Sequence, residues 1–383
     1  MGTIGRRERL ALWLHYAAKA SPRQFQTLRK QFSSLEEAFR LAEKRSLGAF
    51  SGVGDGVKAR MYEAATQGFL ERYTAWLDRH GIAVLIPESE DYPALLREIH
   101  DPPQVLFVKG KLPANPALPI AMVGARRSTK YGRDIAQLFA QGLAESGATI
   151  ISGLARGIDS AAARGALLCK SAACPTVAVL GTGIDVVYPK ENAALCAEIA
   201  ERGAVVTEFL PKTTPSRENF PIRNRIMSGL SRGVVVVEAG ERSGTSITAG
   251  FAHDQGREVF AVPGRITDRQ SVGTNRLIQR GEAKPVFCVD DILQEFSFAA
   301  GYDDGFFSSR KPVRLSSLPE AQQAICRALF EGEANADEIA ERTGLATGLL
   351  NSSLTALLFS GIMKQLPGRV YALDSLNTEL LDE

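Results

Sequence analysis

Histidine and cysteine are scarce in this 383-residue sequence, and their scarcity excludes several kinds of chemistry. The sequence contains four histidines and five cysteines. No two cysteines have Cys-x-x-Cys spacing and no histidine cluster accompanies them, so no metal site is expected. A Ser-His-Asp triad has few candidate histidines for the same reason. The cysteines are therefore interpreted as free thiols in a reducing compartment.

Long hydrophobic runs are also missing. A membrane-spanning helix needs about 20 consecutive apolar residues, and the apolar runs of this sequence are much shorter. Residues 1–20 combine arginines with apolar residues, as a signal peptide does, but His15 and Lys19 interrupt the apolar part. No small-residue cleavage site follows, so a first helix is expected there instead. The sequence therefore predicts a cytoplasmic protein without membrane contact.

Two common nucleotide-binding motifs do not occur. The sequence has no Gly-x-Gly-x-x-Gly motif, which disfavours a nicotinamide or flavin dinucleotide site. It also lacks the Gly-x-x-x-x-Gly-Lys-Ser/Thr motif of ATP-hydrolysing P-loop proteins. No cofactor is therefore expected.

What the sequence does have is an uneven distribution of charge. The formal net charge is only +2. Residues 1–80 contain fourteen Lys and Arg against eight Asp and Glu, and residues 122–232 contain fourteen against nine. Residues 281–383 contain eight against sixteen. This asymmetry indicates a polyanionic partner for the first two parts and not for the last.

Residues 119–297 alternate short apolar runs with amphipathic runs, which is typical of parallel βαβ units. Strands are predicted at 120–123, 149–152, 176–180, 205–207, 233–238 and 259–262, and helices at 133–146, 158–168, 193–202, 221–231, 246–255 and 275–281. The run Val234–Val237 is typical of a central strand that is buried on both faces. A further strand at 81–87 is expected at the sheet edge. The fold class predicted is α/β, with an extended Rossmann-like, doubly wound and mostly parallel sheet.

The flanking segments predict two smaller domains. Residues 1–80 are expected to be a helical domain, in which residues 50–59 resemble a helix-hairpin-helix turn that either binds a DNA phosphate or only packs. Lys58 replaces the usual alanine and favours packing. The main domain is assigned to 81–297 and a linker to 298–312. Residues 313–383 predict a winged helix with an acidic tail, whose third helix lacks Lys and Arg and is not expected to read DNA.

Five predicted strand-end loops contain the candidate site residues: 124–129, 152–159, 181–192, 217–225 and 238–249. Gly124 lets the backbone approach a ligand, and Arg126 or Arg127 can donate to phosphate oxygens. Together the loops place at least four cations on one rim of the sheet, namely Arg126, Lys190, Arg217 and Arg223 or Arg225. A rim of this kind suits a run of phosphates, so single-stranded DNA is the expected ligand. Tyr188 and Phe220 either stack on bases or pack on the sheet.

At these loops the sequence closely resembles the bacterial DNA-processing protein A (DprA/Smf) family. The resemblance rests on motifs that occur in the family's order: VGARRSTKYG, SGLARGIDSAAARGAL, GTGIDVVYPKEN, ENFPIRNRIMSGLSRGVVVVEA, RSGTSITAGFAHDQGREVFAVPG and GTNRLIQRGEAKPV. It implies a non-enzymatic protein that binds single-stranded DNA without sequence specificity, protects incoming DNA in natural transformation and loads RecA recombinase onto it. The partners implied are single-stranded DNA, RecA, single-strand-binding protein and a second copy of the chain.

The resemblance also assigns roles to individual residues. The DNA-contacting arginine of the family corresponds to Arg126, and the other basic contacts to Lys190 and Arg217. The glycine loop runs from Gly153 to Gly157. Ala125 stands where the family often has serine, so one phosphate hydrogen bond is expected to be lost or to come from the backbone. Family members dimerise through the Rossmann-like domain, and Leu277 and Ile278 are the candidate interface residues.

An enzyme is the alternative interpretation. The related lysine-decarboxylase-like Rossmann group contains nucleotide hydrolases, and Asp159, Glu208 or Glu238 could act as a general base in such a protein. Residues 243–246 would then form the phosphate cradle, although this chain has Ser-Gly-Thr where that group has Pro-Gly-Gly-x-Gly-Thr. A protein whose loops sense a small nucleotide is a third possibility.

Overall fold

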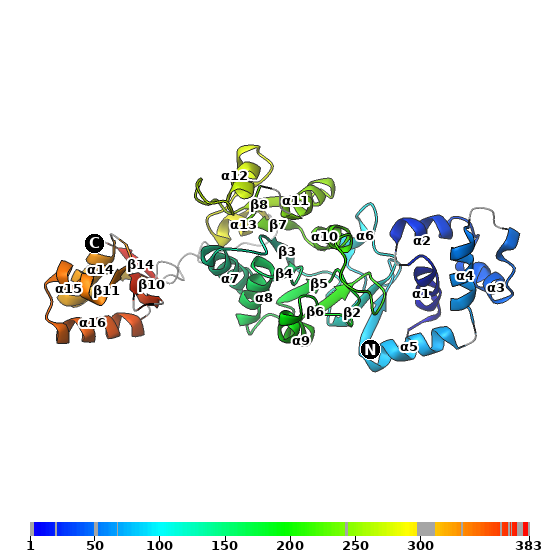
Figure 1. Ribbon diagram of the computed structural model, residues 1–383, viewed down its shortest axis with the longest axis horizontal. Helices are drawn as coiled ribbons and strands as arrows, with labels where there is room; N and C mark the ends of the chain where they lie inside the picture. Colours follow the sequence, from blue (N-terminus) through cyan, green and yellow to red (C-terminus); the bar gives the residue numbers. More distant parts are fainter. Residues whose placement is uncertain are drawn as a thin grey trace. The chain divides into compact units, whose positions relative to one another are not determined.

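The computed structural model describes residues 4–19, 21–49, 53–66, 68–241, 244–296, 311–330, 332–360, 362–366, 368, 370–373 and 378–381 (Figure 1). The chain divides into two compact units, Met1–Ile292 and Leu293–Glu383, which are described separately. The predicted linker lies outside the described residues from 298 to 310, as do residues 50–52 of the predicted helix-hairpin-helix turn and Ser243 of the predicted phosphate cradle.

The first unit begins with short helices whose starts are set by local sequence. They are α1 (Arg6–Ala17), α2 (Pro22–Arg29), α3 (Leu35–Glu43), the 3-10 turn η1 (Leu47–Ala49), α4 (Asp55–Ala64) and α5 (Phe69–Arg79). Ser21 and Ser34 cap α2 and α3 by accepting hydrogen bonds from backbone N–H groups inside each helix. Trp13 is fully buried among these helices, and its indole N–H donates to the Met61 carbonyl at 3.0 Å.

The main feature of this unit is a nine-stranded sheet with the order β1-β2-β6-β5-β4-β3-β7-β8-β9. Its strands are β1 (Ile82–Leu85), β2 (Leu106–Gly110), β3 (Leu118–Val123), β4 (Ala148–Ser152), β5 (Thr176–Val179), β6 (Ala204–Thr207), β7 (Gly233–Val236), β8 (Glu258–Ala261) and β9 (Lys284–Pro285). All pairings from β6 to β9 are parallel, and β2 is antiparallel to both of its neighbours. The predicted mostly parallel sheet is confirmed, and β1 lies at its edge as expected.

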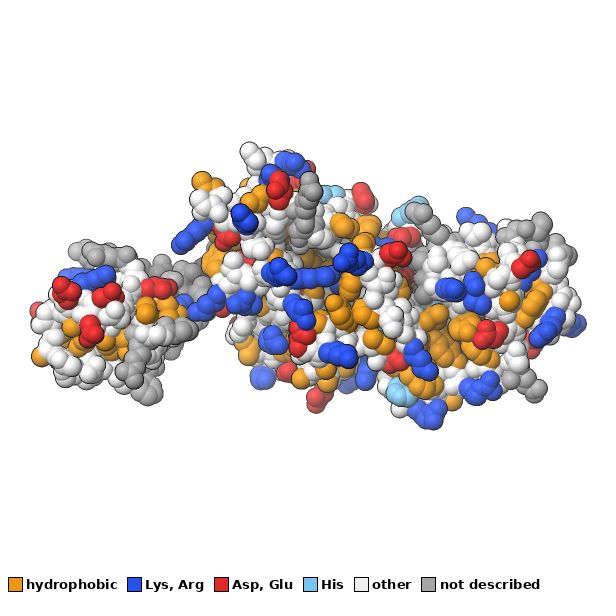
Figure 2. Space-filling model, in the orientation of Figure 1, with side chains coloured by type: hydrophobic (Ala, Val, Ile, Leu, Met, Phe, Trp, Pro, Cys, Tyr) orange, Lys and Arg blue, Asp and Glu red, His pale blue; other side chains and the backbone are white. Residues whose placement is uncertain are grey.

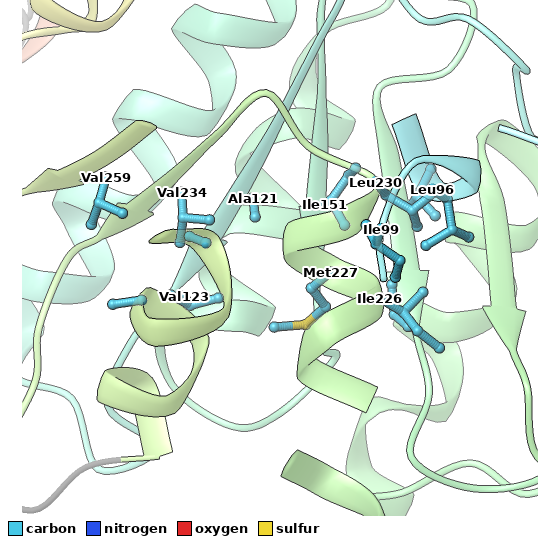
Figure 3. Packing of buried hydrophobic residues seen from close by; sticks show 14 of the residues in the cluster. Leu96, Ile99, Ala121, Val123, Ile151, Ile226, Met227, Leu230, Val234 and Val259 are labelled. Atoms are coloured by element: carbon cyan, nitrogen blue, oxygen red, sulfur yellow. The ribbon is translucent and has the colours of Figure 1, made fainter. Parts of the chain in front are cut away.

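Helices cover both faces of this sheet. They are α6 (Ala94–Arg97), α7 (Lys130–Glu145), α8 (Ile158–Leu168), the 3-10 turn η2 (Lys190–Asn192), α9 (Ala193–Arg202), α10 (Asn219–Gly229), α11 (Gly244–Asp254), α12 (Val272–Gln279) and α13 (Val289–Phe296). Side chains of β5 alternate between the two faces, since Val177 and Val179 join the cluster with α10 and α11, whereas Ala178 joins the cluster with α8 and α9. Figure 3 shows Ile226 and Met227 of α10 packed in the first cluster. Because helices pack on both faces, the sheet is doubly wound, as predicted.

The chain changes direction between β3 and β7. From β3 it proceeds through β4 and β5 to β6, and α10 then returns it to β7 on the other side of β3. In an open parallel sheet, this reversal leaves a crevice at the carboxyl ends of the two strands, because the connecting loops diverge there. The topology thus points to the loops after β3 and β7 as the place for a ligand.

The N-terminal helices pack on one face of the sheet. Leu12 of α1 and Leu77 of α5 share a buried cluster with Phe107 of β2. His15 is buried, and its Nε2 donates to the Glu208 carbonyl at 2.7 Å. Burial lowers the pKa of His15 to about 4, which keeps the ring neutral at neutral pH. Contacts on β2 and just after β6 therefore join the helical segment to the sheet.

The second unit contains α14 (Glu320–Phe330), α15 (Ala336–Thr343) and α16 (Thr347–Phe359), with a sheet of β11 (Ala334–Asn335), β13 (Val370–Leu373) and β12 (Met363–Leu366). A separate pair joins β10 (Lys311–Arg314) to β14 (Thr378–Leu381). Asn335 and Glu338 form a capping box at the start of α15. This is the element order of the predicted winged helix, whose assignment stays a prediction. Within the described part of the chain, every helix is too short or too polar to cross a membrane.

Candidate functional site

A cleft of ≈ 720 Å³ opens at the crevice between β3 and β7. Figure 2 shows Lys and Arg side chains gathered across the middle of the visible face of the first unit. The cleft is lined by residues from six loops and three helices: Val123, Gly124, Ala125, Arg126, Arg127, Ala155, Asp159, Tyr188, Arg217, Phe220, Pro221, Arg223, Asn224, Met227, Gly240, Gly244, Thr245, Ile247, Thr248 and Gln270. The structure thus brings residues of all five predicted strand-end loops together.

Glu238, which follows β7, fixes the loop after β3. Its carboxylate accepts hydrogen bonds from the Thr129 N–H at 2.9 Å and from the Thr129 hydroxyl at 2.5 Å. Its backbone carbonyl accepts from the Ala125 N–H at 2.8 Å. A Cβ on Gly124 would lie 2.5 Å from Ile158 Cγ1, so this glycine permits close packing onto α8. The Ala125 N–H is thus donated within the protein, and the expectation that one phosphate hydrogen bond is lost or comes from another backbone group stays a prediction.

Arg126 lies at the mouth of the cleft beside two aromatic rings. Its side chain is exposed, and its guanidinium carbon is 4.8 Å from the centroid of the Phe220 ring. The Phe220 and Tyr188 ring centroids are 5.9 Å apart. Tyr188 is 42% exposed, so the pair presents aromatic surface to a ligand. Arg127 is also exposed and lines the same cleft, so the structure brings both arginines of the loop to the site.

The glycine loop after β4 packs closely against the loop after β3, and its contact with DNA stays a prediction. The Asp159 carboxylate accepts hydrogen bonds from the Gly153 N–H at 3.0 Å and from the Ala155 N–H at 3.4 Å. Gly157 has φ +77°, and a Cβ there would lie 2.3 Å from the Ala125 carbonyl oxygen. These glycines allow the loops after β3 and β4 to pack together. The Gly153 N–H is therefore not free for a phosphate.

Arg225 does not lie on the rim, contrary to the prediction. It is 3% exposed, and its guanidinium donates to the Glu208 carboxylate and lies 3.3 Å from Asp101. Burial raises the pKa of Glu208 to about 7, and Arg225 partly offsets this rise. The reason for the error is that the polar partners of Arg225 are supplied from distant parts of the chain.

Arg223 lies at the floor of the cleft rather than on its rim. It is 3% exposed, and its Nη1 donates to the Val179 carbonyl. Burial lowers the pKa of Arg223 to about 10, and the nearby Asp159 opposes this change. A Cβ on Gly153 would collide with the Arg223 guanidinium, which explains why glycine occupies that position.

The remaining predicted cations differ in position. Arg217 is exposed and lines the same cleft as Phe220. Lys190 is exposed in η2, directly after the Tyr188-Pro189 segment, but it is not among the residues that line the cleft. Gln270 also lines the cleft and lies outside the five predicted loops. Its position after β8, at the same edge of a parallel sheet, is the signal that could have found it.

The candidate dimer residues have unequal exposure. Leu277 is 9% exposed and belongs to the buried cluster beneath the sheet, whereas Ile278 is partly buried and packs against that cluster. Leu277 is thus a core residue and is not available to a partner, which corrects its assignment to an interface. The spacing of the two residues could not distinguish the core face of α12 from an outer face.

The carboxylates considered as general bases are all engaged elsewhere. Asp159 holds loop N–H groups, Glu208 pairs with Arg225, and Glu238 binds Thr129. All three carboxylates are buried, and Glu238 binds the loop after β3 through Thr129. In the described residues, no group of three or more His, Cys, Asp or Glu side chains is arranged to hold a metal ion. The geometry suits binding of an anion beside aromatic rings.

Known proteins resemble this chain over the region that forms the cleft. The family described as DNA recombination-mediator protein A matches residues 83–297. Protein Smf of Escherichia coli is 37% identical over 305 residues, which cover 78% of this chain and 79% of that protein. DNA processing protein DprA of Streptococcus pneumoniae is 42% identical over 240 residues, which cover 60% of this chain and 82% of that protein.

Two solved structures have a similar fold. The X-ray structure of DNA processing protein A from Streptococcus pneumoniae has a TM-score of 0.62 at 33% identity and covers 75% of this chain and 97% of that chain. The structure that describes the single-stranded DNA binding mode of DNA processing protein A from Helicobacter pylori has a TM-score of 0.50 at 29% identity. It covers 56% of this chain and 95% of that chain.

Proposed function

Because the chain belongs to the DNA recombination-mediator protein A family, we propose that it binds single-stranded DNA in the cleft between β3 and β7. The proposal includes no catalytic step. Phosphates of the strand contact Arg126 and Arg217, with Lys190 next to the cleft, and bases stack on Phe220 and Tyr188. The Helicobacter pylori relative, for which a single-stranded DNA binding mode is described, supports this ligand class.

The observation that carries the proposal is the exposed Arg126 beside the Phe220 and Tyr188 rings. A base can stack on an aromatic ring whatever its identity, and an arginine can donate two hydrogen bonds to a phosphate. Both groups are within reach of one nucleotide only when the base is unpaired, because a duplex keeps its bases stacked inside. The array therefore favours a single strand over a duplex and gives little sequence preference.

We further propose the wider role that the family resemblance implies. The protein would protect incoming single strands in natural transformation and load RecA onto them, in the presence of single-strand-binding protein and in the cytoplasm. Strand exchange by RecA on strands coated with single-strand-binding protein tests this role, and no stimulation by the protein would contradict it.

We also propose a homodimer, with Ile278 as the remaining candidate contact. Light scattering measures the mass in solution, and a result that gives only the 41.3 kDa monomer mass would contradict the homodimer.

An oligonucleotide length series tests the binding proposal. Single strands should bind with an affinity that rises with length and falls steeply with salt, because several phosphates release counterions together. A blunt duplex of equal length should bind much more weakly. Fluorescence anisotropy at two salt concentrations measures both effects. Equal affinity for a mononucleotide and a long strand would contradict the proposal and favour the nucleotide-hydrolase or nucleotide-sensing alternative.

A further inference from the structure

An ion pair between Arg156 and Glu191 lies beside the proposed binding cleft. Arg156 Nε and Nη2 both donate to the Glu191 carboxylate, the second at 3.0 Å. Their side chains are 63% and 52% exposed. Arg156 thus presents to Glu191 the same two-pronged arrangement of donors that a phosphate accepts.

This ion pair is close to the exposed arginine and rings of the cleft. Arg156 lines a hollow of ≈ 160 Å³ together with Arg126, Tyr188 and Phe220. Glu191 belongs to η2, in which the Asn192 side-chain amide donates to the Leu154 carbonyl at 2.9 Å. This bond ties η2 to the loop that contains Arg156. The two charged groups are therefore held within reach of each other by the fold itself.

We propose that Arg156 is an additional phosphate ligand and that Glu191 is a competing anion, which occupies Arg156 until a phosphate of the strand displaces it. The inference rests on the proposed function, since it concerns the same strand in the same cleft. Exposed ion pairs are weak because water and salt screen them, so a phosphate can replace the carboxylate at little cost. The displaced Glu191 then stays near the phosphate and repels it.

The consequence is a limit on affinity. Without Glu191, Arg156 would already be free when the strand arrives, and no carboxylate would repel the bound phosphate. With Glu191 present, its negative charge cancels part of the attraction between Arg156 and a phosphate of the strand. The strand therefore dissociates more readily. A protein that passes a strand to another protein needs such reversibility.

Glu191→Gln tests the inference, because it removes the charge and keeps the size of the side chain. We expect it to tighten binding of an oligothymidylate of about 20 nucleotides by roughly 3- to 10-fold at low salt, and to steepen the salt dependence by about 0.7. Arg156→Ala should weaken binding by no more than about 2-fold, since its guanidinium is already neutralised. In the Arg156→Ala background, Glu191→Gln should give a clearly smaller gain, because only the repulsion of the phosphate by Glu191 is then removed.

Glu198→Gln is the matched control, because Glu198 is an exposed glutamate on α9 outside the residues that line the cleft. The inference is overturned if Glu191→Gln and Glu198→Gln tighten binding equally, since the gain would then reflect net charge. It is also overturned if the gain from Glu191→Gln is equally large when Arg156 is alanine. Failure of the unaltered protein to bind the strand would refute the proposed function itself, whereas binding without a Glu191 effect refutes only this inference.

Discussion

Arg126→Ala is expected to weaken binding of single-stranded DNA by roughly 10- to 100-fold, because a hydrogen-bonded charge contributes about 1.5–3 kcal/mol. Arg126 is exposed and lies 4.8 Å from the Phe220 ring, so its loss removes a phosphate ligand and a contact of the aromatic pair. The dependence of affinity on salt should become shallower by about 0.7. Fluorescence anisotropy with oligothymidylate over a salt series measures both quantities.

Arg164→Ala provides the control for this experiment. Arg164 is an exposed arginine on α8 that does not line the cleft, so its replacement makes the same change in net charge away from the site. Arg126→Lys should retain the salt dependence but lose part of the affinity, because lysine cannot form the two-pronged contact. The thermal stability of Arg126→Ala should be close to that of the parent protein, since the side chain is exposed. Equal affinity of Arg126→Ala and Arg164→Ala would show that Arg126 is not a ligand.

Arg225→Met is expected to lower the free energy of unfolding by about 3–5 kcal/mol at about pH 9, because at that pH it leaves the Glu208 carboxylate buried without its partner. Arg225 is 3% exposed and Glu208 is 1% exposed, so water cannot replace the lost interaction. Denaturant unfolding of the two proteins measures the difference. The double variant Arg225→Met with Glu208→Gln should recover part of the loss, because no unpaired charge then remains.

The destabilisation should also depend on pH. Burial raises the pKa of Glu208 to about 7, and removal of Arg225 raises this pKa further. A carboxyl group whose pKa is raised by folding stabilises the folded state below its ordinary pKa, and this contribution is lost as pH rises through the folded value. At about pH 5 both folded proteins hold Glu208 protonated, so the difference between them should be small, and it should grow towards about pH 9. A difference that is constant with pH, or a stable Arg225→Met that only loses DNA binding, would contradict the structural role.

Much of the sheet could be predicted because its signals are local. Short β-branched runs that end at glycine predicted strands of the sheet. The predicted bounds of α8 and α9 also agree with the structure. The ends of α7 and α10 were less accurate, since their first turns begin inside loops that contain polar residues. Propensity alone does not show where such a loop ends.

The candidate site was only partly predictable, because several of its contacts are non-local. Glycine beside arginine indicated phosphate binding, yet the Gly153 N–H is donated to Asp159 and the Ala125 N–H to the carbonyl of Glu238. A sequence does not show that a loop donor is already satisfied by a carboxylate or carbonyl from another strand. Gly124, Gly153 and Gly157 are explained by close packing between loops.

The arginines of α10 illustrate the same limit. Arg217 precedes the helix and is exposed, whereas Arg223 and Arg225 lie on its buried side. All three are charged residues in one polar segment, so charge alone assigned them to one surface. Burial of Arg225 depends on Glu208 and on Asp101, which is more than a hundred residues away in the chain. Such a pairing has no local signal.

Photo-crosslinking of a single strand that contains 5-iodouracil tests the location of the binding site most directly. A base that stacks on an aromatic ring crosslinks to it on irradiation, and mass spectrometry identifies the modified residue. We expect crosslinks at Phe220 and Tyr188, whose ring centroids are 5.9 Å apart beside Arg126, and their loss when a strand without iodouracil competes. Crosslinks confined to the N-terminal helices or to the second unit, with none at Phe220 or Tyr188, would contradict the account.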